Sequence, residues 1–367
     1  MIAVFVSILA AFSLAIPDAN PSLFFYEKFF TNDKKLQQAF AGKRVWITGA
    51  TSGIGEEMAR QLHGHGANLI ISGRREGELN RVKKSCETTT RSDDSTSDNI
   101  SVLPFDVTDS DEVLSTVVSK ASQKFGGIDI LILNAGAGQL NSAIDSPFSK
   151  SKMLMEVNYF GPMRLAMEVV KKERWEGRTN ESKGHIVVTS SVASKMPLPL
   201  GTSYAASKFA VHGYFSSLRA ECAEWLRIDL PCPGPIATAF QDKAADTNSD
   251  SSATLGDDDE EEGESELKMP VERCAKLIIS GMLGPSSIMQ ETWISRQPTL
   301  FFLYLNQYLP TISNAILNLV GPLRLKAFKA GLPLYQVSSW LKAAKMDKEN
   351  KNGSNNEESE PLTKSEL

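Results

Sequence analysis

The chain has few residues of the kinds that build disulfide frameworks or metal centres. Its four cysteines are scattered and never form a Cys-x-x-Cys pair, a pattern unlike a disulfide scaffold or a zinc site. Its four histidines show no spacing typical of metal ligands. These residues are Cys86, Cys222, Cys232, Cys274, His63, His65, His185 and His212. The sequence therefore predicts chemistry without a metal.

An excess of basic residues is also missing. The 39 lysines and arginines face 44 acids, which gives a formal net charge of −5. Residues 257–266 hold eight of these acids, so the rest of the chain has 39 bases against 36 acids. No segment carries a basic stripe of the kind that binds nucleic acid. We expect no nucleic-acid partner.

Residues 2–16 lack charged side chains altogether and are apolar or small throughout. A membrane-spanning helix needs ~20 such residues, so we predict that residues 1–20 form a signal peptide or a short membrane anchor. Whether this segment is cleaved stays open. The last four residues, Lys364-Ser365-Glu366-Leu367, resemble a Lys-Asp-Glu-Leu retrieval signal.

Together, the two ends predict a location in the lumen of the endoplasmic reticulum, or on its lumen-facing membrane. Sequons at Asn99, Asn180 and Asn352 are then candidate glycosylation sites.

A second uncharged stretch covers residues 297–323. Its length would allow a membrane span, but polar residues and a proline interrupt it: Asn306, Gln307, Pro310, Asn314 and Asn318. Two amphipathic helices that split at Pro310, and lie on a membrane or over a ligand site, fit better. A buried core segment and a true span remain as alternatives.

Two other segments are too polar to bury a core. Residues 241–267 are dominated by Ser, Asp and Glu and predict an acidic mobile insertion, and residues 343–367 predict a disordered tail. Between them, we assign residues 296–342 to the apolar C-terminal extension.

Residues 43–55 carry the first motif with a chemical meaning. Lys43 to Ile47 predicts a buried strand, which enters the loop Thr48-Gly49-Ala50-Thr51-Ser52-Gly53-Ile54-Gly55 and then a helix from Glu56 to His65. Glycines let a backbone approach a pyrophosphate, and the helix N-terminus offers it free N–H groups. The pattern favours a dinucleotide site; the alternative is a tight turn without a ligand.

The next predicted strand, Asn68 to Ser72, ends in Gly73-Arg74-Arg75. Sites for NAD usually have an acid at this point, which holds the ribose 2′-hydroxyl. Two arginines would instead bind a 2′-phosphate. This favours NADP(H), whereas a solvated arginine pair is the plain alternative.

Further strands and helices alternate along the chain. We predict strands over residues 102–105, 128–133, 185–189 and 291–295, and helices over residues 110–125, 150–174, 202–224 and 270–281. This alternation is typical of an α/β Rossmann-type fold, with one doubly wound parallel sheet. Cofactors bind at the carboxyl ends of such strands, where Asp106, Asn134, Ala135 and Gly136 fall.

Tyr204 and Lys208 are four residues apart in a predicted helix, so they share one face. An ammonium beside a phenol lowers the pKa of the phenol and favours proton transfer. Considered alone, such a pair is more often a half-buried aromatic beside a solvated amine.

In this context, the chain resembles the short-chain dehydrogenase/reductase family over residues 43–295. The resemblance rests on the glycine loop, Asn134-Ala135-Gly136, Asn158, Ser191, Tyr204-x-x-x-Lys208 and Pro233-Gly234, all in the family's order. Trp293-Ile294-Ser295 and Tyr308-Leu309-Pro310 also resemble one subgroup of that family.

The resemblance implies roles for four catalytic residues. Ser191 would polarise a substrate carbonyl, and Tyr204 would give or take the proton at its oxygen. Lys208 would lower the pKa of Tyr204 and bind the nicotinamide ribose, and Asn158 would hold a water in the proton path.

The same resemblance, together with the motifs, implies a set of NADP(H) contacts. These are Gly49, Ser52, Gly53, Ile54, Gly55, Arg74, Arg75, Asp106, Val107, Asn134, Ala135, Gly136, Tyr204, Lys208, Pro233, Gly234, Ile236 and Thr238.

The expected function is an NADP(H)-dependent oxidoreductase that interconverts carbonyl and alcohol groups on a retinoid, steroid or other lipid-like substrate. We also expect membrane association. The family resemblance leaves open whether the chain is a monomer or a homo-oligomer. Residues 227–231 predict a poor central strand, because Asp229 is charged and Pro231 lacks an N–H group. That weakness and the acidic insertion leave open a non-catalytic NADP(H)-binding scaffold. A further alternative keeps the enzyme as an NAD-dependent alcohol dehydrogenase that works oxidatively.

Overall fold

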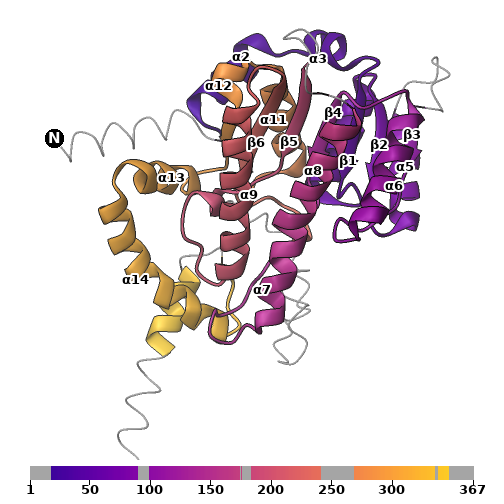
Figure 1. Cartoon of the computed structure of the whole chain (residues 1–367). Coiled ribbons are helices and arrows are strands. Elements are labelled where there is room, and N and C mark those ends of the chain that lie inside the picture. Colours follow the sequence, from indigo (N-terminus) through magenta and orange to yellow (C-terminus); the bar gives the residue numbers. More distant parts are fainter. Residues whose placement is uncertain are drawn as a thin grey trace, which may run out of the picture.

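Seven parallel strands form the centre of the computed structural model (Figure 1). The model describes residues 18–89, 99–173, 175, 183–240, 268–334 and 338–346. The strands lie in the order β3-β2-β1-β4-β5-β6-β7, which confirms the predicted doubly wound sheet. Their bounds are β1 Arg44–Thr48, β2 Asn68–Ser72, β3 Ile100–Val102, β4 Ile130–Leu133, β5 Gly184–Val188, β6 Leu226–Pro233 and β7 Glu291–Ile294.

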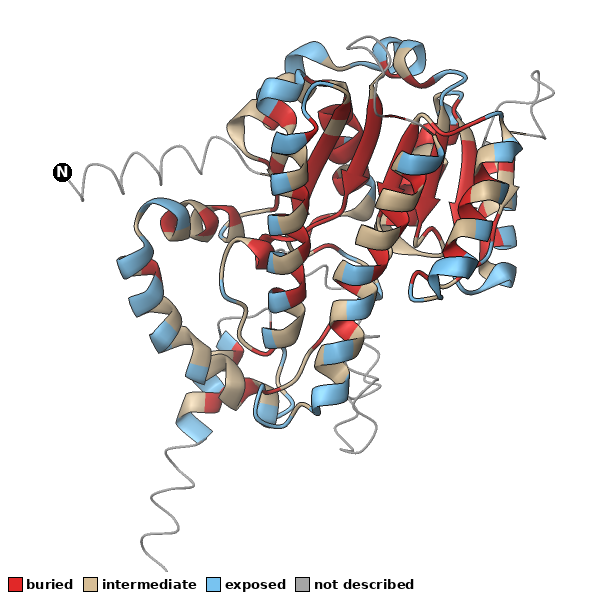
Figure 2. Cartoon of the chain, viewed as in Figure 1, coloured by how far each residue is buried: buried red, intermediate tan, exposed pale blue. Residues whose placement is uncertain are grey.

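Helices cover both faces of the sheet, so its strands are buried on both sides (Figure 2). Val45 and Ile47 of β1 pack into one core with α4, α5 and α11, whereas Trp46 packs into the other with α6, α8 and α9. This alternation follows from the two-residue period of a strand. The bounds are α4 Gly53–Gly64, α5 Glu76–Thr89, α6 Asp111–Lys124, α8 Gly161–Lys172, α9 Thr202–Glu221 and α11 Val271–Leu283.

The predicted helix over residues 150–174 is not continuous. The structure has α7 at Phe148–Met155, a π-helical turn η1 at Glu156–Phe160, and then α8. A π-helical turn inserts an extra residue into the helix and is common at functional sites. Asn158 lies in this turn, so the interruption sets the direction of a predicted catalytic side chain.

Strand β6 shows that the expected weakness of residues 227–231 was wrong. All of its residues except Arg227 are buried, and it pairs with β5 and β7. Pro231 lies beyond the last residue pair that β6 shares with β5, and its carbonyl accepts from the N–H of Ser190 at 2.8 Å. The carboxylate of Asp229 is paired within the sheet with the guanidinium of Arg227 and contacts Nε2 of His185, each at 2.8 Å.

Strand β3 also differs from its prediction. It ends at Val102, and residues 103–105 continue as extended loop that still donates to Ile71 and Gly73 of the neighbouring chain segment.

Two helices before β1 pack against α11 on one face of the sheet. They are α2 Pro21–Phe30 and α3 Asp33–Phe40, and α2 packs against α11 and the short helix α12 Ser286–Met289. Arg273 on α11 binds both Asp18 and Glu27. The uncharged segment at residues 2–16 lies outside the described residues.

The C-terminal stretch forms two helices, as predicted, and they separate at Pro310. They are α13 Thr299–Tyr308 and α14 Pro310–Lys329. Within the described part of the chain, no helix combines the length and the apolar character that crossing a membrane requires. Residues 338–346 are helical, so the tail that was predicted to be disordered from residue 343 begins with structure.

Candidate active site

The glycine loop connects β1 to α4 at the carboxyl edge of the sheet. Gly49 has a φ of +68°, and a Cβ there would lie 2.6 Å from Cα of Ala135, so the loop after β4 leaves no room for a side chain. A Cβ on Gly55 would lie 2.5 Å from Nδ2 of Asn134. These glycines bring the loop and the N-terminus of α4 together, as a dinucleotide site requires.

The N-terminus of α4 has donors for a phosphate group. Ser52 is its N-cap residue, but the Ser52 side chain makes no capping hydrogen bond. The first N–H groups of a helix are not used within the helix, and they attract anions. The residues present therefore fit the pyrophosphate of a dinucleotide.

Asn134, Ala135 and Gly136 follow β4 and face the glycine loop. Nδ2 of Asn134 donates to the carbonyl of Gly49 at 3.1 Å. The Thr48 hydroxyl accepts from the backbone N–H of Asn134 at 3.1 Å and of Ala135 at 3.3 Å. The two loops are thus held as one unit.

The other predicted cofactor residues lie beyond neighbouring strands of the same sheet. Arg74 and Arg75 are exposed after β2, and Asp106 and the buried Val107 follow β3. Nη1 of Arg74 lies 3.8 Å from Oδ2 of Asp106, and the Arg74 side chain is 78% exposed. Such a long, solvated ion pair leaves the guanidinium available to a ligand.

Residues after β6 complete this edge. Gly234 lies so close to Ser295 that a Cβ would be 2.1 Å from its Oγ. A Cβ on Gly53 would lie 3.2 Å from Cγ2 of Thr238, so the segment after Pro233 returns to the glycine loop. Ile236 is buried and forms a bridge with Met269.

Ser191 follows β5 and begins the 3₁₀ helix η3, Val192–Ser194. Its Oγ accepts from the N–H of Ala193 at 3.1 Å and donates to the carbonyl of Pro233 at 3.4 Å. The second bond is long, so its hydrogen can turn to another acceptor at little cost. This is what a residue that polarises a carbonyl must do.

Helix α9 brings Tyr204 and Lys208 to the same place. Nζ of Lys208 lies 5.8 Å from the centre of the Tyr204 ring and donates to the carbonyl of Thr189 at 2.8 Å. Lys208 is only 6% exposed, and burial lowers the pKa of its ammonium to about 8. The hydrogen bond ties α9 to the end of β5, two residues before Ser191.

Asn158 links three segments of the site. Its Oδ1 accepts from the N–H of Ala137 at 2.8 Å. Its Nδ2 donates to the carbonyl of Ala137 and to the hydroxyl of Ser207, each at 2.9 Å. Asn158 therefore joins η1 to the loop after β4 and to α9.

The structure also adds a residue that the sequence did not single out. Gln139 accepts, through Oε1, from the N–H groups of Ser203 at 2.8 Å and Tyr204 at 3.2 Å. It caps α9, whose own N-cap residue Gly201 has no side chain to do so. No local pattern around Gln139 could have revealed this, because its partners are 64 and 65 residues away.

Comparisons with known proteins show which family the chain belongs to. The family model described as short chain dehydrogenase matches residues 43–249. The human dehydrogenase/reductase SDR family member 7 is 36% identical over 78% of this chain and 80% of its own length. The hydroxysteroid 11-beta-dehydrogenase 1-like protein of Xenopus tropicalis is 37% identical over 53% of this chain and 63% of its own length.

Among solved structures, an alcohol dehydrogenase from Thermococcus sibiricus, complexed with 5-hydroxy-NADP, has a similar fold. Its TM-score is 0.57 at 20% identity, covering 70% of this chain and 97% of that one. The similarity to dehydrogenase/reductase SDR family member 7 confirms the resemblance to one subgroup of the family that the sequence showed. The chain therefore belongs to the short-chain dehydrogenase/reductase family and is an oxidoreductase that uses NAD(H) or NADP(H).

Proposed function

We propose that the protein is an NADP(H)-dependent oxidoreductase that interconverts carbonyl and alcohol groups on apolar substrates. The observation that carries this proposal is the position of Lys208, which lies below the Tyr204 ring and is anchored to the end of the strand that delivers Ser191. The proton donor Tyr204 on α9 and the hydrogen-bond donor Ser191 after β5 therefore come from two elements that the Lys208–Thr189 hydrogen bond holds together.

In the direction of reduction, NADPH supplies the hydride that adds to the carbonyl carbon. Ser191 turns its hydroxyl hydrogen from Pro233 to the carbonyl oxygen and stabilises the negative charge that develops there. Tyr204 donates its phenolic proton to the same oxygen. The Lys208 ammonium stabilises the phenolate that remains. In the reverse direction, Tyr204 takes the proton from the alcohol.

Arg74 and Arg75 favour NADP(H) over NAD(H). Both are exposed after β2, where enzymes that use NAD carry an acid. A guanidinium binds a 2′-phosphate through paired hydrogen bonds. The complex of the Thermococcus relative with an NADP analogue is consistent with this preference.

Apolar residues around the catalytic segments favour an apolar substrate. Val192, next to Ser191, packs with Leu300 and Leu303 of α13. Leu200, shortly before Tyr204, packs with Ala327 of α14. The ring of Phe240 lies 6.0 Å from the ring of Tyr204. A relative named for hydroxysteroid dehydrogenation is consistent with a lipid-like substrate.

One of the two reasons for the scaffold alternative is gone, since β6 is a regular buried strand. The other reason, the acidic insertion at residues 241–267, lies outside the described residues. An NAD-dependent alcohol dehydrogenase remains the rival, and the cofactor comparison below distinguishes it.

The test is a panel of hydrophobic carbonyls that includes decanal, retinal and a steroid ketone, with NADPH or NADH. We expect NADPH oxidation with at least one of them, and loss of that activity in Tyr204→Phe. Tyr214→Phe is the matched control, because Tyr214 is on the same helix but packs against Tyr159 and Phe215. Activity that survives Tyr204→Phe would contradict the mechanism.

Arg74→Ala tests the cofactor preference. We expect KM for NADPH to rise roughly 10-fold or more, because a charge-assisted hydrogen bond to the phosphate is lost, while KM for NADH stays similar. Equal effects on the two cofactors would remove the argument for NADP(H).

We further propose that the enzyme works in the lumen of the endoplasmic reticulum, at its membrane. Helix α2 begins a few residues after the apolar segment 2–16. Phe25 and Phe29 on α2 are 46% and 65% exposed, and their rings stack with centres 6.1 Å apart. Lys28 lies beside the Phe29 ring. Exposed aromatics with a neighbouring lysine are typical of a surface that meets lipid headgroups.

A flotation assay of the full chain with vesicles containing phosphatidylserine tests this surface. Phe25→Ser with Phe29→Ser should reduce binding, whereas Phe209→Ser, an exposed phenylalanine on α9, should not. Endoglycosidase-sensitive glycans on the protein in cells would support the lumen. Digestion of the folded domain by a protease added to the cytosolic side would contradict it.

A further inference from the structure

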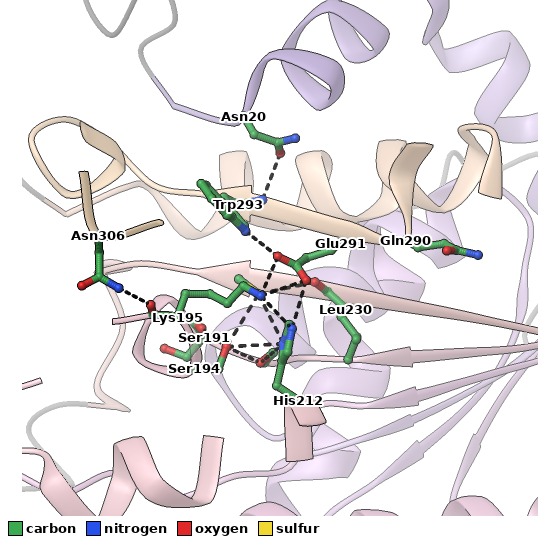
Figure 3. Close-up of polar contacts among 12 residues, drawn as sticks. Asn20, Ser191, Ser194, Lys195, His212, Leu230, Gln290, Glu291, Trp293 and Asn306 are labelled. Carbon is green, nitrogen blue, oxygen red and sulfur yellow. Dashed lines mark hydrogen bonds and ion pairs between the residues drawn. The ribbon is translucent and has the colours of Figure 1, made fainter. Parts of the chain in front are cut away.

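A partly buried polar cluster lies directly behind Ser191, and the reaction described above does not use it. Its members are Ser190, Ser194, Lys195, His212 and Glu291, which come from the segment after β5, from α9 and from β7 (Figure 3). Sequence analysis assigned none of them a role.

Glu291 is the anion of the cluster. Its carboxylate lies 2.9 Å from Nζ of Lys195, accepts from Nε1 of Trp293 at 2.8 Å, and lies 3.0 Å from Nε2 of His212. Burial by itself would raise its pKa, but the hydrogen bonds from His212, Lys195 and Trp293 outweigh burial and lower the pKa to about 2. Glu291 is therefore ionised under working conditions and acts only as an acceptor.

This carboxylate fixes the orientation of His212. Because Glu291 can only accept, Nε2 of His212 keeps its hydrogen and donates it to this carboxylate. Nζ of Lys195 also lies 3.2 Å from Nε2, but this ammonium finds its acceptors in Glu291. On the other side of the ring, Nδ1 lies 3.2 Å from Oγ of Ser190 and 3.4 Å from Oγ of Ser194.

The two serines carry the contact to the backbone of Ser191. The hydroxyl of Ser190 donates to Oγ of Ser194 at 3.0 Å, and Ser194 donates to the carbonyl of Ser191 at 2.6 Å. Both serines are almost fully buried, so no water replaces a lost partner. A rotation of the Ser191 peptide would break these bonds and move its Oγ away from Ala193.

We propose that the pair His212–Glu291 positions the hydroxyl of Ser191 for catalysis, acting through Ser190 and Ser194. The proposal rests on the role of Ser191 in the proposed function. His212 and Glu291 are positioning residues, since they act on Ser191 through Ser190 and Ser194. Lys195 extends the cluster to the C-terminal extension, because its carbonyl accepts from Nδ2 of Asn306 on α13 at 2.8 Å.

The chain offers a matched control for this pair. His185 on β5 and Asp229 on β6 form another buried histidine–carboxylate pair, with Nε2 and Oδ2 2.8 Å apart. His185 lies near the amino end of β5, whereas Ser191 follows its carboxyl end. Replacing either histidine should lower the stability of the fold, but only the replacement of His212 should displace the hydroxyl of Ser191.

The experiment compares crystal structures and kinetics of His212→Leu, His212→Gln and His185→Leu, with NADPH and the fastest carbonyl of the panel. In His212→Leu we expect Oγ of Ser191 to leave the N–H of Ala193, and kcat to fall roughly 10- to 100-fold, as misplacement by about 1 Å can cause. KM for the carbonyl and the affinity for NADPH should change little. His212→Gln, whose amide can donate to Glu291 and form a hydrogen bond with Ser190, should keep most of the activity.

Three results would overturn the proposal: Ser191 unmoved in His212→Leu, a fall in kcat no larger than in His185→Leu, or no rescue by glutamine. If His212→Leu does not fold, Glu291→Gln takes its place, with a smaller displacement and loss expected in the same direction. If the wild type reduces no carbonyl, the proposed function fails separately, and the position of Ser191 in the crystal structures still decides the question.

Discussion

Lys208 is the residue on which the proposed chemistry depends most. Its aliphatic stem and ammonium are buried, and the ammonium keeps one backbone acceptor, the carbonyl of Thr189. Burial disfavours the charged form, which is why its pKa falls from 10.5 to about 8. The charge that assists Tyr204 is therefore lost at a pH only slightly above neutral.

This shift predicts a pH dependence of reduction. As pH rises through about 8, Lys208 loses its proton, and kcat/KM for NADPH, which reports groups of the free enzyme, should fall. Lys208→Arg should lower the rate but remove this step, because a guanidinium keeps its charge. A wild-type profile that stays level up to about pH 9.5, well beyond the shifted pKa, would contradict the assignment.

The residues that the sequence could predict are those in local motifs. Tyr204 and Lys208 are four positions apart on one helix, and the glycines of the first loop are close together in the chain. Glu291 and His212 are 79 residues apart, so only the folded sheet shows that they meet. His212 did carry one local signal, because it follows Lys208 by four residues and lies on the same side of α9.

At the scale of elements, β6 shows how a local rule can be overruled by tertiary contacts. A proline and an aspartate argued against a central strand, yet Pro231 lies where no donor is needed on the β5 side. Asp229 is 3% exposed and has both His185 and Arg227 as partners. Arg227 in turn donates to the carbonyls of Gly281 and Gly284 at the end of α11.

Removing this carboxylate should cost much stability. Asp229→Ala leaves the partly buried guanidinium of Arg227 and the buried imidazole of His185 without the carboxylate that they contact, and we expect a loss of about 3–5 kcal/mol in the free energy of unfolding. Urea denaturation measures it. Glu87→Gln is the control, since its ion pair with Lys83 is long and partly exposed, and it should cost less than about 1 kcal/mol. Equal stability of the two variants would contradict this account of β6.

The helix that carries Asn158 could be predicted only in outline. Its length and position follow from the sequence, but the π-helical turn at Glu156–Phe160 does not. Asn158 in this turn forms hydrogen bonds with Ala137 and Ser207. Because these partners come from other elements, local sequence does not reveal them.

At the scale of the whole molecule, both described ends attach to the sheet domain through contacts between residues far apart in the chain. Asp18 to Asn20 lie beside β7, and Arg273 holds them there. The C-terminal helices instead contact segments next to Ser191 and Tyr204. The alternation of strands and helices predicted the doubly wound parallel sheet, but the two attachments depend on contacts between residues more than 100 positions apart.

The most direct measurement follows the hydride itself. The enzyme is incubated with NADPH that carries deuterium at C4 of the nicotinamide, on the face from which hydride leaves, and with the carbonyl that it reduces fastest. The account predicts that mass spectrometry will find the deuterium on the carbinol carbon of the product, and that Tyr204→Phe will form almost no labelled alcohol. Labelled alcohol formed equally by wild type and Tyr204→Phe, or product without deuterium, would contradict it.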